Sequence, residues 1–286
     1  MTDSQVVTEP APAKINPYLK VLSRRDDGFH EIETLVLPVT LADGVQAVPA
    51  PELRLSIVGE LAGDVPADED NLVWRAAGAL RDHVGESRGA HLLLSKRIPV
   101  AAGLGGGSAD AAATLRALDR LWKRGLGIEG LIEVAAGVGS DVPALLRTGP
   151  VIARGGGERV EPVDLPRTWW VLLSGKEKIS AADAYAWWDS AERAGDSDLE
   201  PLLVALREGL VEEAGKLLRN DLQGPVIGHH PQIETAIGRV EDAGALGAIV
   251  SGSGPTVAGL ARDGAHAEQL ASLVDGAVVA SMGAAN

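Results

Sequence analysis

The alternation of apolar and polar residues predicts a chain of mixed strands and helices. Residues 12–24 and 31–40 are apolar, β-leaning segments, and the turn "RRDDGFH" joins them. Residues 53–58, "LRLSIV", alternate in polarity as a half-buried strand does, and residues 90–98, "AHLLLSKRI", predict another strand that Pro99 ends. Between them, Asp70 or Asn71 can cap a helix whose apolar residues repeat at helical spacing.

The second half of the chain continues this pattern. Residues 127–147 predict a helix, a glycine turn and a short helix from about Ser140, and residues 149–163 predict a hairpin with a glycine tip. The remaining expected elements are strands at 168–175 and 276–282, helices at 180–194, 200–219, 231–243 and 264–274, and two strands around a glycine turn at 244–262. The elements do not repeat as equal βαβ units, and we expect an N-terminal domain at 1–165 and a C-terminal domain at 166–286.

Composition narrows the class of protein. The 286 residues carry a net charge of −14, which argues against nucleic-acid binding because phosphate backbones require a basic surface. The chain has no cysteine, which excludes disulfides, thiolate metal sites and cysteine nucleophiles. The sequence shows neither a signal-like N-terminus nor an apolar run of ~18 residues. We therefore expect a cytoplasmic enzyme, monomeric or weakly dimeric, that binds no membrane.

The segment "IPVAAGLGGGSADAAATLRAL", residues 98–118, joins a glycine-rich loop directly to an alanine-rich helix. It lacks the lysine of a P-loop and the third glycine of the dinucleotide fingerprint. Glycines let a ligand approach the backbone, and a helix N-terminus offers unpaired N–H groups to an anion. Ser108 is expected as the N-cap, with Asp110 in the first turn. The segment thus predicts a phosphate cradle, with a flexible glycine turn as the alternative.

Several motifs then occur in the order known from one family. "PVAAGLGGGSADAAA" resembles the ATP-binding motif of the GHMP kinase superfamily, in the form found in 4-diphosphocytidyl-2-C-methyl-D-erythritol kinases of the non-mevalonate isoprenoid pathway. "PAKINPYLKVLSRRDDGFHEIETL", "GSDVP", "ARGGGERV", "RNDL" and "VSGSGPTV" are similar to other blocks of that family. The matches run from Pro12 to Val257, so the resemblance covers most of the chain.

The resemblance implies both a fold and a reaction. The fold is α+β, made of α/β two-layer sandwiches in two domains: an N-terminal domain like domain 2 of ribosomal protein S5 and a C-terminal GHMP kinase domain, with the active site between them. ATP would phosphorylate the 2-hydroxyl of 4-diphosphocytidyl-2-C-methyl-D-erythritol, giving ADP and the 2-phosphate. Mg²⁺ is expected to be carried mainly by the nucleotide, with Ser108 near it and no metal-ligating cluster in the protein.

The resemblance also assigns site residues. It implies ATP contacts from the glycine loop, the start of its helix and one helix cap: Pro99, Val100, Ala101, Ala102, Gly103, Leu104, Gly105, Gly106, Gly107, Ser108, Ala109 and Asn71. It implies contacts to the cytidine diphosphate substrate from Asn16, Phe29, His30, Tyr185, Ser251, Gly252, Ser253 and Gly254. The motif "SGSGPT" at 251–256 is expected to pack beside the glycine loop, and "RND" at 219–221 to brace the cleft.

Two residues are the candidates for catalysis. Asp141, in "GSDVP", matches the family's catalytic aspartate, and a carboxylate can accept the proton of an attacking hydroxyl. Its alternative role is that of a helix cap. Lys14, in "PAKIN", lies between apolar neighbours on a predicted strand, where a charge is costly to bury without an anion. It is expected to keep Asp141 ionised and to stabilise phosphoryl oxygens, with a solvated strand edge as the alternative.

The scarce aromatic residues fall in informative places. Phe29 lies in a polar turn, and the resemblance implies that Phe29 and Tyr185 sandwich a cytosine ring, with His30 at the base edge. Core packing is the alternative for Tyr185, and Tyr18 is open between the two roles. The sequence departs from the family at Phe29, where tyrosine is commoner, at the hairpin tip "GGGE", and at Pro17, which suggests an edge strand there.

Two other functions compete with this interpretation. One is a GHMP kinase acting on homoserine, mevalonate or a sugar, against which "DGFH" and the triple glycine before Ser108 argue. The other is a nucleotide-binding relative without catalysis, against which the presence of both Lys14 and Asp141 argues.

Overall fold

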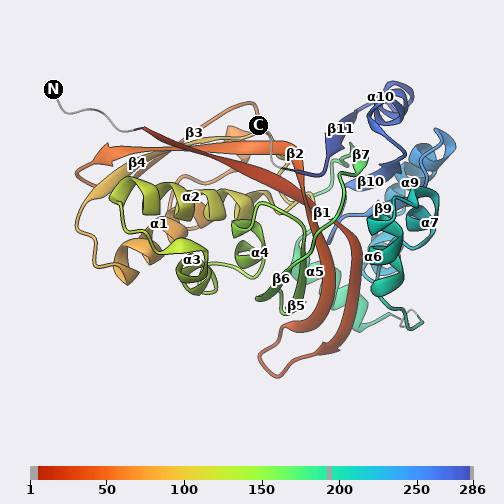
Figure 1. The fold of residues 1–286 in the computed structure, drawn as a ribbon, viewed down its shortest axis with the longest axis horizontal. Coiled ribbons are helices and arrows are strands. Elements are labelled where there is room, and N and C mark those ends of the chain that lie inside the picture. The colour runs from red at the N-terminus through yellow and green to blue at the C-terminus, as the bar shows by residue number, and fades with distance from the viewer. Residues whose placement is uncertain (1–5, 192–194, 284–286) are drawn as a thin grey trace.

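The structure, a computed structural model, describes residues 6–191 and 195–283. Its first sheet has the strand order β3-β4-β2-β1-β8, with β5 pairing to β2 and β6 to β5. The strands of this sheet are β1 (Val7–Arg24), β2 (His30–Ala50), β3 (Arg54–Val58), β4 (Gly89–Ser95), β5 (Val151–Gly155), β6 (Arg159–Pro162) and β8 (Arg219–Asn220). The antiparallel pair of β1 and β2 forms its centre and runs the length of the N-terminal half (Figure 1).

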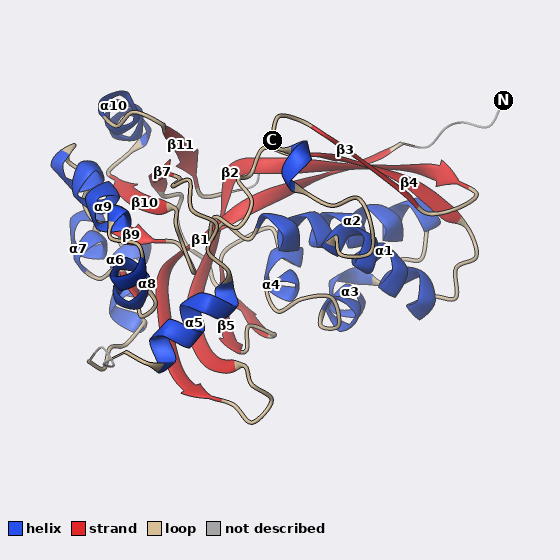
Figure 2. Cartoon of the chain, turned by 180° about the vertical axis from the view of Figure 1, so that it is seen from behind, coloured by secondary structure: helices blue, strands red, loops and turns tan. Residues whose placement is uncertain are grey.

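Helices cover one face of this sheet. They are α1 (Leu72–His83), α2 (Gly106–Trp122), α3 (Gly127–Ala135) and α4 (Val142–Leu146), and both Figure 1 and Figure 2 show them together on that face. The alanines of α2 are buried against the sheet and the neighbouring helices, which explains why the sequence keeps small residues there. A one-turn 3₁₀ helix, η1 (Ala62–Asp64), lies between β3 and α1.

The second sheet is antiparallel and has the order β11-β7-β10-β9. Its strands are β7 (Trp169–Leu173), β9 (Ala248–Val250), β10 (Val257–Ala261) and β11 (Ala277–Ser281). The helices of this half are α5 (Ala181–Asp189), α6 (Glu200–Arg207), α7 (Val211–Lys216), α8 (Gln223–His229), α9 (Gln232–Asp242) and α10 (Gly264–Leu273).

The structure differs from the expected elements in several places. The single helix at 200–219 is two helices, α6 and α7, because Gly209 between them adopts a φ of +70°. The short elements β8 and α8 were not expected. The helix expected at 180–194 ends at Asp189, and residues 192–194 of that range lie outside the described residues.

Pro17 lies in β1, which has β2 on one side and β8 on the other, but β1 has no β8 partner at Pro17 itself, as the expected local edge requires. The pairing of β1 with β2 also shifts register between Ile15 and Tyr18, so the N–H that proline lacks falls at an irregularity of the ladder. The pairing with β8 begins only at Tyr18.

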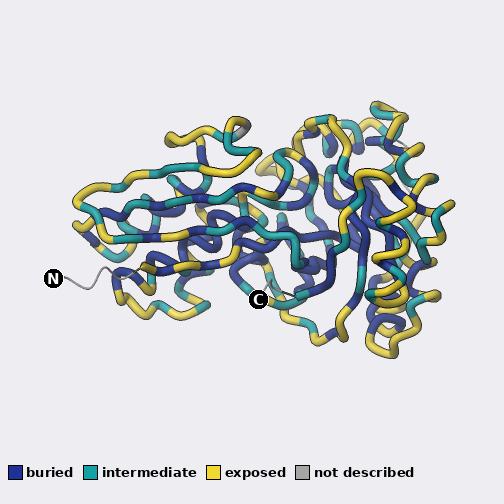
Figure 3. Tube along the Cα trace, turned by 90° about the horizontal axis from the view of Figure 1, so that it is seen from above, coloured by how far each residue is buried: buried dark blue, intermediate teal, exposed yellow. Residues whose placement is uncertain are grey.

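The two halves share a buried cluster. It joins Ile15 of β1 and Leu37 of β2 to Trp170 of β7 and Leu260 of β10, and Figure 3 shows buried chain at the junction of the halves. The division at residues 165 and 166 agrees with the change of sheet between β6 and β7, but β8 returns to the first sheet. The domain boundary therefore stays a prediction.

Candidate active site

A cavity of about 750 Å³ opens where the glycine loop, β1, β2, the start of α4 and α5 meet. Most residues that the sequence assigned to ATP or substrate line it. Four do not: Leu104, Ala109, Ser251 and Gly254 are buried behind its wall. The aromatic residue left open, Tyr18, is also absent from the wall, since it is buried and its hydroxyl bonds to Ser197.

The glycine loop is held in an unusual backbone conformation. Gly103 and Gly105 have φ values of +74° and +65°, and Ala101 has a φ of +53°, which a residue with a Cβ adopts at a cost. Gly105 is the cap residue of α2, so the helix begins at Gly106. The loop therefore leads directly into the N-terminus of a 17-residue helix, an arrangement that favours binding of an anion.

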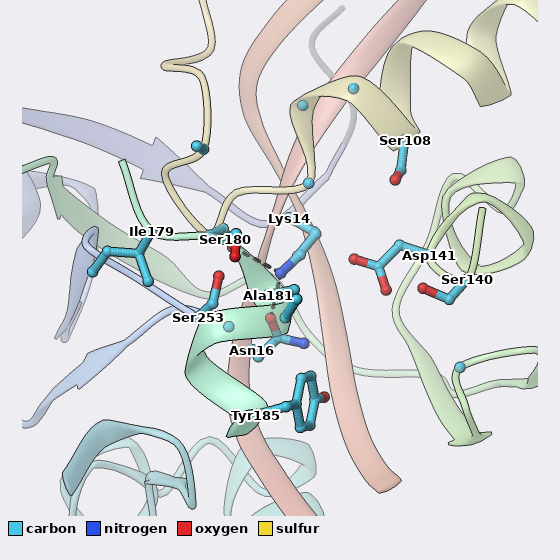
Figure 4. A pocket seen from close by; sticks show the side chains of 18 of the residues that line it. Lys14, Asn16, Ser108, Ser140, Asp141, Ile179, Ser180, Ala181, Tyr185 and Ser253 are labelled. Carbon is cyan, nitrogen blue, oxygen red and sulfur yellow. Dashed lines mark hydrogen bonds between the residues drawn. The ribbon is translucent and has the colours of Figure 1, made fainter. Parts of the chain in front are cut away.

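Ser108 is not the N-cap that the sequence predicted. It is the third residue of α2, because the left-handed glycine at 105 begins the helix earlier than a hydroxyl cap would. Ser108 still lines the cavity, and Figure 4 shows it on the same side as Asp141. Asn71 does cap α1, with its side-chain oxygen accepting from the Val73 N–H at 2.9 Å, and it also lines the cavity.

The motif at 251–256 packs against the glycine loop, as the sequence predicted. The Ser251 hydroxyl donates to the Gly103 carbonyl at 3.0 Å, and the Thr256 N–H to the Ala102 carbonyl at 3.3 Å. A Cβ on Gly103 would lie only 2.0 Å from the Ser251 carbonyl oxygen. This close approach explains why residue 103 has no side chain.

Lys14 is a buried residue of β1, and its side chain extends to the glycine loop. Its ammonium donates to the Asn16 side-chain oxygen at 2.6 Å and to the Gly103 carbonyl at 2.7 Å. The Asn16 amide is itself oriented by the Thr34 hydroxyl at 2.9 Å. Burial lowers the pKa of Lys14, and the negative charge of Asp141 opposes that shift. The solvated strand edge considered for Lys14 is therefore wrong.

Asp141 occupies the cap position of α4, yet its side chain makes no capping hydrogen bond. Figure 4 shows its carboxylate directed toward the Lys14 ammonium across the cavity. Within residues 6–191 and 195–283 no direct ion pair joins these two groups, so their interaction acts through the open space between them. A carboxylate left without a capping partner is available to a ligand.

Two of the residues expected around the cytosine ring contact each other directly. Tyr185 stacks on His30, with ring centroids 4.7 Å apart, while the Phe29 ring is 60% exposed at the mouth of the cavity. Burial raises the pKa of Tyr185, and the charge of Asp141 raises it further. The His30 Nε2 lies 2.8 Å from the carboxylate of Asp189, a residue that the sequence did not single out.

A buried charged cluster beside the glycine loop was not predicted from the sequence. Lys96 bonds to Asp43 and, at 2.8 Å, to Asp110. Asp43 also accepts the N–H groups of Arg97 and Ile98, so it holds the entrance of the loop. Burial, assisted by the charge of Asp43 and opposed by Lys96, raises the pKa of Asp110 to about 8.

Asp110 was predicted in the first turn of α2, but it lies beyond that turn. Its carboxylate pairs with Lys96 and does not act on the helix dipole. One of its carboxylate oxygens, Oδ1, is buried without a protein partner. No local signal could have revealed this cluster, because Asp43 and Lys96 are 53 residues apart in the sequence.

The "RND" segment braces the cavity wall, as expected. The Asn220 amide donates to the carbonyls of Val250 and Gly252 at 2.8 and 2.7 Å. Asp221 accepts the Val21 N–H of β1 at 2.9 Å. These bonds tie the second glycine motif to the central sheet.

The described part of the chain holds no group of three or more histidine, aspartate or glutamate side chains arranged for a metal ion. Among the described residues, no helix is both long and apolar enough to cross a membrane.

Comparison with known proteins places this geometry in a family. Residues 71–149 match the model of the GHMP kinases N terminal domain, and residues 202–277 that of the GHMP kinases C terminal. The chain is 40% identical to a 4-diphosphocytidyl-2-C-methyl-D-erythritol kinase of Mycolicibacterium paratuberculosis. The 275 matched residues cover 94% of this chain and 87% of the relative. It is 42% identical to the kinase of the same name from Salinispora tropica, with 91% and 85% covered.

Solved structures agree with these relatives. The crystal structure of a 4-(cytidine 5'-diphospho)-2C-methyl-D-erythritol kinase matches with a TM-score of 0.82 and 34% identity, covering 96% of this chain and 99% of the other. Homoserine kinase from Cytophaga hutchinsonii, at 19% identity and a TM-score of 0.74, shares the fold. The resemblance seen in the sequence motifs and the two-domain α+β fold are confirmed, and the chain belongs to the 4-diphosphocytidyl-2-C-methyl-D-erythritol kinase family of the GHMP kinases.

Proposed function

We propose that the protein transfers the γ-phosphoryl group of ATP to the 2-hydroxyl of 4-diphosphocytidyl-2-C-methyl-D-erythritol, in isoprenoid precursor biosynthesis. The bond from the γ-phosphorus to the bridging oxygen of ATP breaks, and a bond from that phosphorus to the substrate oxygen forms. The hydroxyl proton leaves, and the products are ADP and the 2-phosphate. The observation that carries this proposal is the arrangement of Lys14 and Asp141 across one cavity, beside a glycine loop that ends at a helix N-terminus.

Asp141 is the group that would accept the hydroxyl proton. Its carboxylate faces the cavity without a capping bond, and proton removal makes the alcohol a better nucleophile. The positive charge of Lys14 and the negative charge of Asp141 attract each other across the cavity.

Lys14 would stabilise the charge that develops on the transferring phosphoryl group. Its ammonium is fixed by the Asn16 oxygen and the Gly103 carbonyl, so it needs little reorganisation when the ligand arrives. The N–H groups at the start of α2 would hold the adjacent phosphates of ATP.

Mg²⁺ fits the donor set near the loop, since hydroxyl and carboxylate oxygens are its usual protein ligands. The Ser108 hydroxyl would contact an ion carried by the nucleotide, and Asp141 lies on the same side of the cavity. The ion would neutralise phosphate charge during the transfer.

The experiment is ADP release with ATP and, in separate reactions, the cytidyl substrate, mevalonate and homoserine. Turnover with the cytidyl substrate alone is expected. Turnover only with mevalonate or homoserine would reject the substrate, and nucleotide binding without ADP from any acceptor would favour a non-catalytic role.

Variants then test the roles. Asp141→Asn should lower kcat by roughly 10²-fold or more while ATP affinity stays within about twofold. Lys14→Met should lower kcat/KM in the same assay. Lys216→Met is the control, because this lysine is exposed and pairs with Glu213, one turn earlier on α7.

A further inference from the structure

The carboxylate of Asp189 lies at the end of α5 and contacts His30 at the mouth of the cavity. Its Oδ1 is 2.8 Å from the His30 Nε2, and its Oδ2 is 3.4 Å from the guanidinium of Arg24. All three residues line the cavity. The His30 side chain is only 7% exposed, so the ring cannot turn freely away from this partner.

The rest of the contacts fix the ring in one plane. Tyr185 stacks on one face of His30 at 4.7 Å and an interplanar angle of 17°. Trp188 meets the ring edge-on, with centroids 5.6 Å apart. The imidazole is thus held by two aromatic residues and one carboxylate.

The carboxylate determines which ring nitrogen carries the proton. An ionised carboxylate only accepts hydrogen bonds, so the Nε2 beside it must be the donor. In the neutral imidazole the other nitrogen, Nδ1, is then an acceptor. Within the described residues no protein group bonds to Nδ1, so this atom is available to a ligand in the cavity.

An acceptor at this position distinguishes two pyrimidines. Cytosine presents a 4-amino group, which is a donor, whereas uracil presents a 4-oxo group, which is an acceptor. A binding site that forms a hydrogen bond to one ligand rejects an analogue that cannot form it, because a buried polar atom of the site is then left unpaired. An Nδ1 acceptor can therefore accept a hydrogen bond from the 4-amino group of cytosine. Against uracil, the lone pair of Nδ1 would face the lone pairs of the 4-oxo group, and no hydrogen bond could form.

We propose that Asp189 is a positioning residue that sets base selectivity, by holding His30 in the tautomer whose Nδ1 accepts from the cytosine amino group. Arg24 assists by fixing the second oxygen of the same carboxylate. This inference rests on the proposed function, because it assumes that the cytidine end of the substrate lies against His30.

The test compares Asp189→Asn with the wild-type protein on matched cytidyl and uridyl diphosphate substrates. An amide can offer its NH₂ group to Nε2 and so release Nδ1 to become the donor. The ratio of kcat/KM for the cytidyl over the uridyl substrate should fall by roughly 10-fold or more. Asp183→Asn is the control: this carboxylate is on α5 but contacts Ser180 at the other end of the helix, and its variant should keep the ratio.

Two further measurements separate a specific role from a structural one. The ¹⁵N chemical shifts of the His30 ring should show Nε2 protonated and Nδ1 unprotonated in the wild-type protein, and the variant should lose this pattern. Equal losses for both substrates, or an Nδ1-protonated ring in the wild-type protein, would overturn the proposal.

A binding measurement keeps this test apart from the proposed activity. Calorimetric titration with CDP and UDP needs no turnover, and the wild-type protein should prefer CDP by a ratio that Asp189→Asn reduces. If the wild-type protein binds CDP selectively yet releases no ADP with the cytidyl substrate, the proposed reaction fails while the role of Asp189 stands. If CDP and UDP bind equally to the wild-type protein, the role of Asp189 fails.

Discussion

Replacing Gly103 with alanine perturbs the contact on which the cavity depends. Gly103 lies where the glycine loop meets the second glycine motif, and its φ of +74° is in the left-handed region. The added Cβ would lie 2.0 Å from the Ser251 carbonyl oxygen and 2.8 Å from the Gly254 nitrogen. Both are backbone atoms, so no side-chain rotation can relieve the overlap, and the two segments must separate.

The expected cost follows from three contributions. A left-handed alanine costs about 1–2 kcal/mol. Separation also weakens the bond from the Ser251 hydroxyl to the Gly103 carbonyl, of about 0.5–1.5 kcal/mol, and the bond from the Lys14 ammonium, of about 1.5–3 kcal/mol. We expect Gly103→Ala to lower the free energy of unfolding by about 3–6 kcal/mol, which corresponds to a fall in Tm of roughly 5–10 °C.

Urea denaturation of the variant and the wild-type protein measures this difference. The control is Gly85→Ala, which has a φ of +60° but no heavy atom within 4 Å of the added Cβ, so it bears only the backbone cost. It should lose about 1–2 kcal/mol. If both variants lose the same free energy of unfolding, the close approach at Gly103 contributes nothing and the reasoning is wrong.

Three other predictions concern separate parts of the site. Because burial raises the pKa of Asp110 from its ordinary 3.8 to about 8, the fold binds this proton more tightly than the unfolded chain does. The free energy of unfolding of the wild-type protein should therefore exceed that of Asp110→Asn by the largest amount below the ordinary pKa, and this difference should decline as pH rises toward about 8. Urea titrations of both proteins at several pH values measure the difference. A difference that stays constant with pH would contradict the prediction. Asn220→Ala removes the hydrogen bonds to the Val250 and Gly252 carbonyls and should lower the free energy of unfolding, measured by urea denaturation, by about 2–4 kcal/mol. A loss below about 0.5 kcal/mol would show that water replaces the amide. Phe29→Ala removes an exposed ring, so Tm should hardly change, while KM for the cytidyl substrate should rise roughly 5- to 100-fold in steady-state assays; an unchanged KM would remove Phe29 from base stacking.

The parts of the site that the sequence predicted are those with a local signal. The glycine loop, the following helix and the cap at Asn71 were predictable because backbone freedom and capping depend on neighbouring residues. Ser108 was misplaced for the same reason. A serine before a helical run is a strong cap signal, but a left-handed glycine at 105 starts the helix first.

The remaining parts depend on contacts between distant segments. Asp189 lies 159 residues from His30, and nothing around either residue indicates the other. The break between α6 and α7 needed the information that Gly209 is left-handed, since a glycine inside a helical pattern is tolerated as often as it ends one. The pairing of β8 with β1 involves only two residues of β8 and has no periodic pattern.

The buried cluster shared by Ile15 and Trp170 has a consequence for how the enzyme moves. Side chains of both halves pack together there, so one half could swing against the other as a rigid body only by breaking these packed contacts. Ligand entry must then rely on short adjustments at the rim, where the Phe29 ring is already outside. Heating should accordingly unfold both halves in one cooperative transition.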